Sequence, residues 1–171
     1  MLFLGLLPTV LSSATPNSMK TVTEYFDEEK TKPEYQKSYY IENDEEVLHG
    51  AETFWFPDGS IEGSALYKNG TQDGVSFWNY RNGDTRWECL FSEGRLLEGK
   101  FYHHGRRLAS EIKEGSGQWK EFDESAGTKL VYVVNFIDGV KDGEEINYDD
   151  IGNIYSVKLW EQGILKQEDQ H

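Results

Sequence analysis

The chain has 171 residues, a length that fits one domain or one array of repeats. Aromatic residues make up 14% of the sequence although hydrophobic residues make up only 37%, and this aromatic content argues against an intrinsically disordered chain. The formal net charge of −14 argues against a nucleic-acid-binding protein, which needs a basic surface. It favours a soluble acidic protein, in which the charge either attracts a basic partner or serves solubility alone.

Residues 1–14 are predicted to be a signal peptide. Their apolar run from Leu2 to Leu11 is too short to span a bilayer, and Ser12, Ser13 and Ala14 supply small residues for cleavage after Ala14. No lysine or arginine precedes the run, which departs from the usual pattern of a signal peptide. We therefore expect export to the periplasm, the cell envelope or the medium, with the cytoplasm as the alternative.

Residues 15–34 are predicted to form a leader and a degenerate first repeat, and residues 35–171 to form a repeat array. The segment from Thr21 to Leu48 has the length and the aromatic residues of a repeat, but it carries Glu, Lys and Asn where later copies have glycine. An atypical copy is expected at the end of an array, because terminal repeats cap the stack.

A repeat of about 24 residues extends from Gly50 towards the C-terminus, as the spacing of Gly115, Gly139 and Gly163 illustrates. Glycine adopts positive φ without steric cost, and a two-residue hairpin turn requires positive φ. Each repeat glycine is therefore predicted to mark a reversal of the chain. The predicted turn glycines are Gly50, Gly59, Gly70, Gly74, Gly83, Gly94, Gly99, Gly115, Gly139, Gly143, Gly152 and Gly163.

These turns predict an all-β fold, an extended single-layer antiparallel β-meander of roughly ten to twelve strands built from hairpin repeats. A large apolar residue stands three positions before the second glycine of each unit, and alternate residues of a strand share one face. We interpret these residues as a structural stripe, with a ligand-binding aromatic platform as the alternative. The predicted aromatic stripe comprises Tyr67, Trp87, Phe91, Tyr132, Phe136 and Trp160.

The stretch "HGAETFWFPDGSIEGSALYKNGTQDGVSFWNYRNG" resembles the MORN variant repeat of bacterial YwqK-like proteins. The pairs His49-Gly50, Asp73-Gly74, Glu98-Gly99 and Asp142-Gly143 occupy the first position of that pattern, and the segment from Gly105 to Gly127 departs from it. Members of this family are commonly labelled antitoxins, and related MORN arrays act as interaction or membrane-associated scaffolds. The resemblance implies no catalytic residues, because the family pattern contains only structural positions.

No catalytic, cofactor-binding or metal-binding residue is predicted, and no cofactor is expected. His49, His103 and His104 stand in predicted turns, and with His171 they are the only histidines, none of them at metal-ligand spacing from a cysteine or a third histidine. The single cysteine, Cys89, excludes an internal disulfide and is predicted to be a small buried apolar residue.

Carboxylates are abundant, and we interpret them as solvated turn charge rather than as catalytic acid–base pairs. The groups concerned are Asp27, Glu28, Glu29, Asp44, Glu45, Glu46, Asp142, Glu144, Glu145, Asp149 and Asp150.

We expect a non-enzymatic protein-binding repeat protein of the antitoxin or immunity kind, which captures a basic protein partner. One alternative is an exported structural or surface protein of the cell envelope. Another is a carbohydrate-binding module, which requires Trp55, Trp78 or Trp119 in line on the surface. No transmembrane segment and no nucleic-acid partner are expected, and the edge strands of an open meander could pair two copies into a homodimer.

Overall fold

The computed structural model describes residues 18–125 and 127–170, so the predicted signal peptide lies outside the described residues. Regular structure in the described part consists of antiparallel strands and one short 3-10 helix, η1 (His104–Arg106). The strands are β1 (Lys20–Tyr25), β2 (Pro33–Glu42), β3 (Glu45–Trp55), β4 (Ile61–Lys68), β5 (Thr71–Gln72), β6 (Gly74–Asn79), β7 (Thr85–Ser92), β8 (Arg95–Tyr102), β9 (Leu108–Lys113), β10 (Ser116–Phe122), β11 (Leu130–Ile137), β12 (Val140–Tyr148), β13 (Ile154–Glu161) and β14 (Ile164–Gln170).

All strands belong to one open antiparallel sheet in which each strand pairs with the next in the chain, and the short β5 pairs with β4. This confirms the predicted all-β meander. Residues 18–125 and 127–170 form 14 strands rather than ten to twelve, for two reasons. The degenerate first repeat supplies two full strands, β1 and β2, and a bulge at Asp73 separates β5 from β6.

Tight two-residue turns line one edge of the sheet. In five of them a residue of positive φ is followed by a glycine of positive φ, for example Asn69 (52°) and Gly70 (79°), which is the requirement of a type I′ hairpin turn. The turns predicted at Gly70, Gly94, Gly115, Gly139 and Gly163 are therefore confirmed.

Longer loops line the opposite edge. Gly59, Gly83 and Gly152 lie in three of these loops, with φ values of 89°, 85° and 91°, so the reversals predicted there are confirmed as well.

The turns predicted at Gly50, Gly99 and Gly143 are wrong, because these glycines lie inside β3, β8 and β12. The turn predicted at Gly74 is also wrong, because Gly74 is the first residue of β6. Gly50 and Gly143 sit in bulges in which three residues oppose a single residue of the neighbouring strand, and their φ values are 102° and 87°. Gly99 serves a different purpose: a Cβ built on it would lie 2.9 Å from the ring of Phe101.

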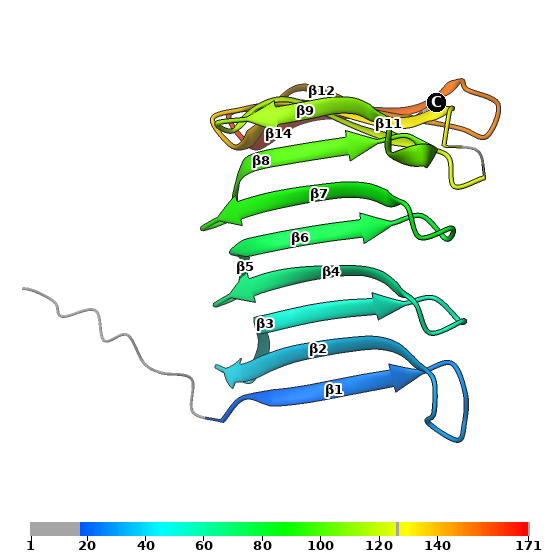
Figure 1. Ribbon diagram of the computed structural model, residues 1–171. Helices are drawn as coiled ribbons and strands as arrows, with labels where there is room; N and C mark the ends of the chain where they lie inside the picture. Colours follow the sequence, from blue (N-terminus) through cyan, green and yellow to red (C-terminus); the bar gives the residue numbers. More distant parts are fainter. Residues whose placement is uncertain (1–17, 126, 171) are drawn as a thin grey trace, which may run out of the picture.

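The sheet does not stay flat along its length. Strands β1 to β8 are stacked as a ladder, and strands β9 to β14 lie across the β8 end of that ladder (Figure 1). Only Ser116 and Gly117 of β10 pair with β9, in the segment that departs from the repeat pattern. Alanine would not fit at Gly117, because its Cβ would lie 2.3 Å from the carbonyl oxygen of Glu111.

Because the sheet folds back after β8, side chains of β10 and β11 pack against β7 and β8. The ring centroids of Trp87 on β7 and Trp119 on β10 are 5.1 Å apart, although β8 and β9 lie between these strands in the sheet. We call the face that carries these two rings the inner face. Its buried core consists of Cys89, Phe91, Leu96, Phe101, Ile112, Val134 and Phe136.

Candidate functional site

All six residues of the predicted aromatic stripe lie on the inner face. Phe91 and Phe136 belong to the buried core, and Trp87 and Tyr132 pack against it. The outermost two, Tyr67 on β4 and Trp160 on β13, are half-buried.

The prediction missed the rings that extend this stripe across the first half of the sheet. Tyr35 and Phe54 have ring centroids 4.8 Å apart, and Phe54 and Trp78 are 5.0 Å apart. Trp78 then stacks on Trp87 at 5.7 Å. Tyr35, Phe54 and Trp78 are half-buried and lie near the loop edge, so their spacing from a tight-turn glycine could not reveal them.

The three tryptophans named for a carbohydrate-binding module, Trp55, Trp78 and Trp119, are all half-buried. Trp78 and Trp119 turn their rings towards neighbouring rings, and a Cβ built on Gly63 would lie 2.3 Å from the Trp78 indole. Because neighbouring side chains cover much of these ring surfaces, the packing favours a structural role for them over stacking against a sugar.

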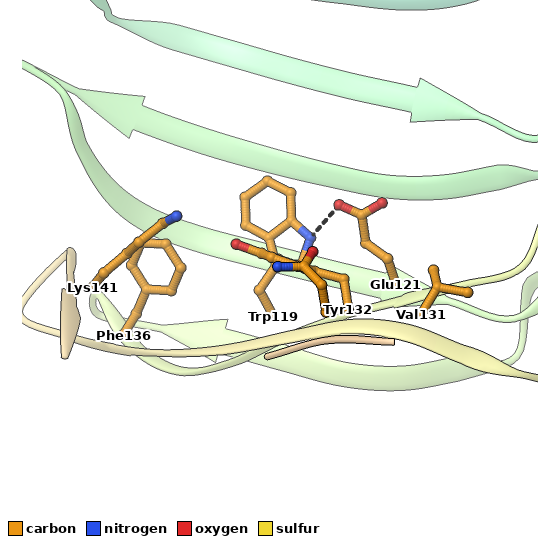
Figure 2. A pocket seen from close by; sticks show the side chains of 7 residues that line it. Trp119, Glu121, Val131, Tyr132, Phe136 and Lys141 are labelled. Carbon is orange, nitrogen blue, oxygen red and sulfur yellow. Dashed lines mark hydrogen bonds between the residues drawn. The ribbon is translucent and has the colours of Figure 1, made fainter. Parts of the chain in front are cut away.

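A hollow of about 470 Å³ opens on the inner face beside the core (Figure 2). The Trp119 indole forms one wall and donates a hydrogen bond from Nε1 to Oε1 of Glu121 at 3.0 Å. The hollow is lined by Trp119, Glu121, Val131, Tyr132, Phe136, Lys141 and Asn147.

The carboxylate of Glu145 lies next to this hollow and organises a polar cluster, which we call the Glu145 site. Lys141 Nζ donates to Glu145 Oε2 at 2.6 Å, and Trp160 Nε1 donates to the same oxygen at 2.7 Å. The Lys141 ammonium also lies 4.9 Å from the centroid of the Trp160 ring, within the range of a cation–π interaction. Burial, followed by the negative charge of Glu145, raises the pKa of Tyr132.

The interpretation of the carboxylates as solvated turn charge is wrong for Glu145. This residue lies in β12, and its side chain is only 8% exposed. Its burial is tolerated because an ammonium and an indole N–H satisfy the charge. Glu45 and Glu46 are also strand residues, at the start of β3, whereas Asp27 and Asp149 accept backbone hydrogen bonds in loops.

A second carboxylate occupies the inner face near the N-terminal end of the sheet. Tyr35 donates a hydrogen bond from its hydroxyl to Glu52 Oε1 at 2.6 Å. Burial raises the pKa of Tyr67, and the charge of Glu52 adds to that effect. Glu52 is half-buried, and no lysine, arginine or histidine of the described chain forms an ion pair with it. We call Glu52, Tyr35 and Tyr67 the Glu52 site.

A groove of about 510 Å³ lies at the loop edge of the inner face. Arg86 contributes to its wall but pairs with Glu121 at 2.7 Å, and Arg81 packs over the Phe56 ring at 5.8 Å. Glu34 is exposed and forms no ion pair with any residue that the structure describes. The groove is lined by Phe26, Glu34, Phe54, Trp55, Phe56, Pro57, Glu62, Arg81, Arg86 and Glu124.

The histidines take part in packing of the loops and of one bulge. His49 lies in the β3 bulge rather than in a turn, with its Nδ1 3.1 Å from Asn69 Oδ1. His103 Nδ1 is 2.9 Å from the Gly127 carbonyl oxygen, and His104 packs against Tyr80. His171 lies outside the described residues. In residues 18–125 and 127–170, no three His, Cys, Asp or Glu side chains are grouped so that they could hold a metal ion.

Cys89 is 4% exposed, which confirms its predicted burial, and burial raises the pKa of its thiol to about 12. A thiol that stays protonated at neutral pH is a poor nucleophile. Within the described part of the chain, no helix is long and apolar enough to cross a membrane.

No protein-family model matches this sequence, and no curated protein matches it.

Proposed function

We propose that this protein is a non-enzymatic binding protein that holds a basic protein partner on the inner face of β1 to β6. The observation that carries the proposal is the incomplete cover of this face: the core cluster comes from β7 to β11, and Tyr35 and Phe54 stay half-buried. Aromatic side chains that are partly exposed on a rigid sheet are typical of protein interfaces.

The charge of the chain supports a basic partner. The net charge is −14, and the groove at the loop edge presents the Glu34 carboxylate beside an aromatic wall while its arginines are engaged within the chain. Opposite charge on a partner would speed association, and salt would weaken that effect. The resemblance to MORN variant proteins labelled antitoxins adds the expectation that the partner is a toxin.

The test is affinity capture from a lysate of the source organism with three immobilised forms: the wild-type protein, Glu34→Lys and Glu144→Lys. Glu144 is exposed and lies on the opposite face, across from Leu159, so it is a control with the same change in charge. We expect one basic protein to be held by the wild type and by Glu144→Lys, to be lost from Glu34→Lys, and to elute with salt. Equal retention by all three forms, or a partner of acidic pI, would contradict the proposal.

A further inference from the structure

The Glu52 site and the Glu145 site are the same position in two repeats. Glu52 follows the bulge glycine Gly50 by two residues, and Glu145 follows Gly143 by two. In both places the bulge sets three residues of the carboxylate strand against one residue of the preceding strand, Ser38 or Asn135. The strand registers on both sides of the bulge therefore align residue by residue.

The aromatic surroundings of the two carboxylates are also equivalent. Tyr35 of β2 corresponds to Tyr132 of β11, each of them across from the residue two positions after the carboxylate. On the following strand, Tyr67 corresponds to Trp160, because each pairs with the bulge glycine. Both sites thus present one carboxylate between two amphipathic rings.

The two sites differ in the cation. Lys141 stands two residues before Gly143, and its ammonium is held by the Glu145 carboxylate and the Trp160 ring. The equivalent residue of the first site, two before Gly50, is Leu48, which has no charge to offer.

The other charged groups near Glu52 do not replace that lysine. Lys37 lies directly across from Glu52 on β2, but its ammonium bonds to Glu46 and lies 5.3 Å from the Tyr39 ring. Glu24 on β1 lies across from Tyr35 and adds negative charge, and the residue facing Glu52 from β4 is Ala65. The Glu52 site is therefore an ammonium site without an ammonium of its own.

We infer that the Glu52 site binds the ammonium group of a lysine side chain that the partner supplies. The inference rests on the proposed function and narrows it: the partner would place a lysine, rather than only a positive surface, on the inner face. The ligand would repeat what Lys141 does at the Glu145 site, with one charge-assisted hydrogen bond to the carboxylate and one contact with the ring of Tyr67.

The test uses a short capped peptide with one lysine, added to the isotope-labelled full chain and followed by NMR. The control is the same peptide with the lysine acetylated, which removes the charge. We expect the lysine peptide to shift the signals of Tyr35 and Tyr67, and the acetylated peptide to leave them in place. Shifts spread evenly over the acidic turns would overturn the inference.

Three variants locate the binding. Glu52→Gln should weaken peptide binding about tenfold or more, since a hydrogen bond to a charged group contributes about 1.5–3 kcal/mol. Glu144→Gln, with the same change in charge on the opposite face, should change it less than about twofold. Leu48→Lys should supply an internal ammonium and abolish binding. Equal effects of Glu52→Gln and Glu144→Gln, or undiminished binding by a folded Leu48→Lys, would refute the proposed site.

Failure of this inference can be told apart from failure of the proposed function. If a basic protein is captured and Glu52→Gln retains it fully, the lysine site is wrong and the binding function stands. If the lysine peptide binds as described but no basic protein distinguishes Glu34→Lys from the wild type, the ammonium site stands and the proposed docking face is wrong.

Discussion

Replacing Gly115 by alanine should destabilise the protein more than a positive φ alone can explain. Gly115 has φ of 76°, and in the left-handed region a residue with a Cβ costs about 1–2 kcal/mol. A Cβ on Gly115 would also lie 2.5 Å from the backbone nitrogen of Gly139. That nitrogen donates to the Gly115 carbonyl at 2.9 Å, and the Gly139 carbonyl accepts from Leu96 N–H at 3.0 Å.

The alanine therefore forces the turn between β11 and β12 away from β8. Two backbone hydrogen bonds would be stretched or lost, each contributing about 0.5–1.5 kcal/mol. Added to the cost of the positive φ, the expected loss in the free energy of unfolding for Gly115→Ala is about 2–5 kcal/mol.

The matched control is Gly105→Ala. Gly105 has φ of 74°, but a Cβ built on it meets nothing within 4 Å, so only the backbone cost of about 1–2 kcal/mol applies. Urea unfolding followed by tryptophan fluorescence measures both variants against the wild type. If the two alanines lower the free energy of unfolding equally, the contact between the two turns does not constrain the fold and the reasoning fails.

Three further results are expected. The thiol of Cys89, whose pKa burial raises to about 12, should react with a thiol reagent at pH 8 only after unfolding, and rapid labelling of the folded chain would contradict its place in the core. The Gly105 N–H, together with Asn82, lowers the pKa of Asp84. The contribution of ionised Asp84 to the stability of the folded protein is therefore complete above the unfolded-state pKa of about 3.9, and it is lost as the pH falls through the lower folded-state pKa. Asp84→Asn should therefore make the midpoint of urea unfolding depend less on pH on the acid side. Lys141→Met should lower the free energy of unfolding by about 3 kcal/mol, the lower end of the cost of breaking a buried ion pair, because the Lys141 side chain is 31% exposed. Adding Glu145→Gln should recover part of the loss.

The sequence predicts the hairpins because their chemistry is local. At the tight turns a positive φ is needed at two successive residues, and pairs such as Asn69-Gly70 and Asp138-Gly139 meet this need without help from the rest of the fold. The face of each strand follows from alternation, so the stripe through Trp87 and Phe136 is placed correctly.

A glycine in the sequence does not by itself indicate whether it lies in a turn, in a bulge or beneath an aromatic ring. Gly70 at a tight turn and Gly143 in a bulge both have positive φ, at 79° and 87°, and the two look alike in sequence. Gly63 and Gly99 are required instead by rings that cross above them, Trp78 and Phe101. These demands depend on neighbouring strands, so a one-dimensional spacing wrongly assigns Gly50, Gly99 and Gly143 to turns.

The local sequence pattern could not predict that the sheet folds back after β8. It depends on Trp87 meeting Trp119 across two intervening strands and on Arg86 pairing with Glu121 at the loop edge. Both contacts join residues more than one repeat apart, and in each the second residue, Trp119 or Glu121, lies in the segment where the repeat itself is least regular.

The buried carboxylate of Glu145 shows that a bulge can bring together two side chains that a regular strand would hold far apart. Lys141 and Glu145 are four residues apart, and in a regular strand such a pair shares a face but is separated by about 13 Å along the strand. The bulge at Asp142, Gly143 and Glu144 packs three residues opposite Asn135, so the ends of this segment approach and the ion pair closes at 2.6 Å. The stretch from Leu48 to Glu52 has the same bulge and the same carboxylate but begins with leucine. A sequence feature that looks like solvated charge thus becomes a closed ion pair in one repeat and an open carboxylate in another, and the residue two positions before the bulge glycine decides which.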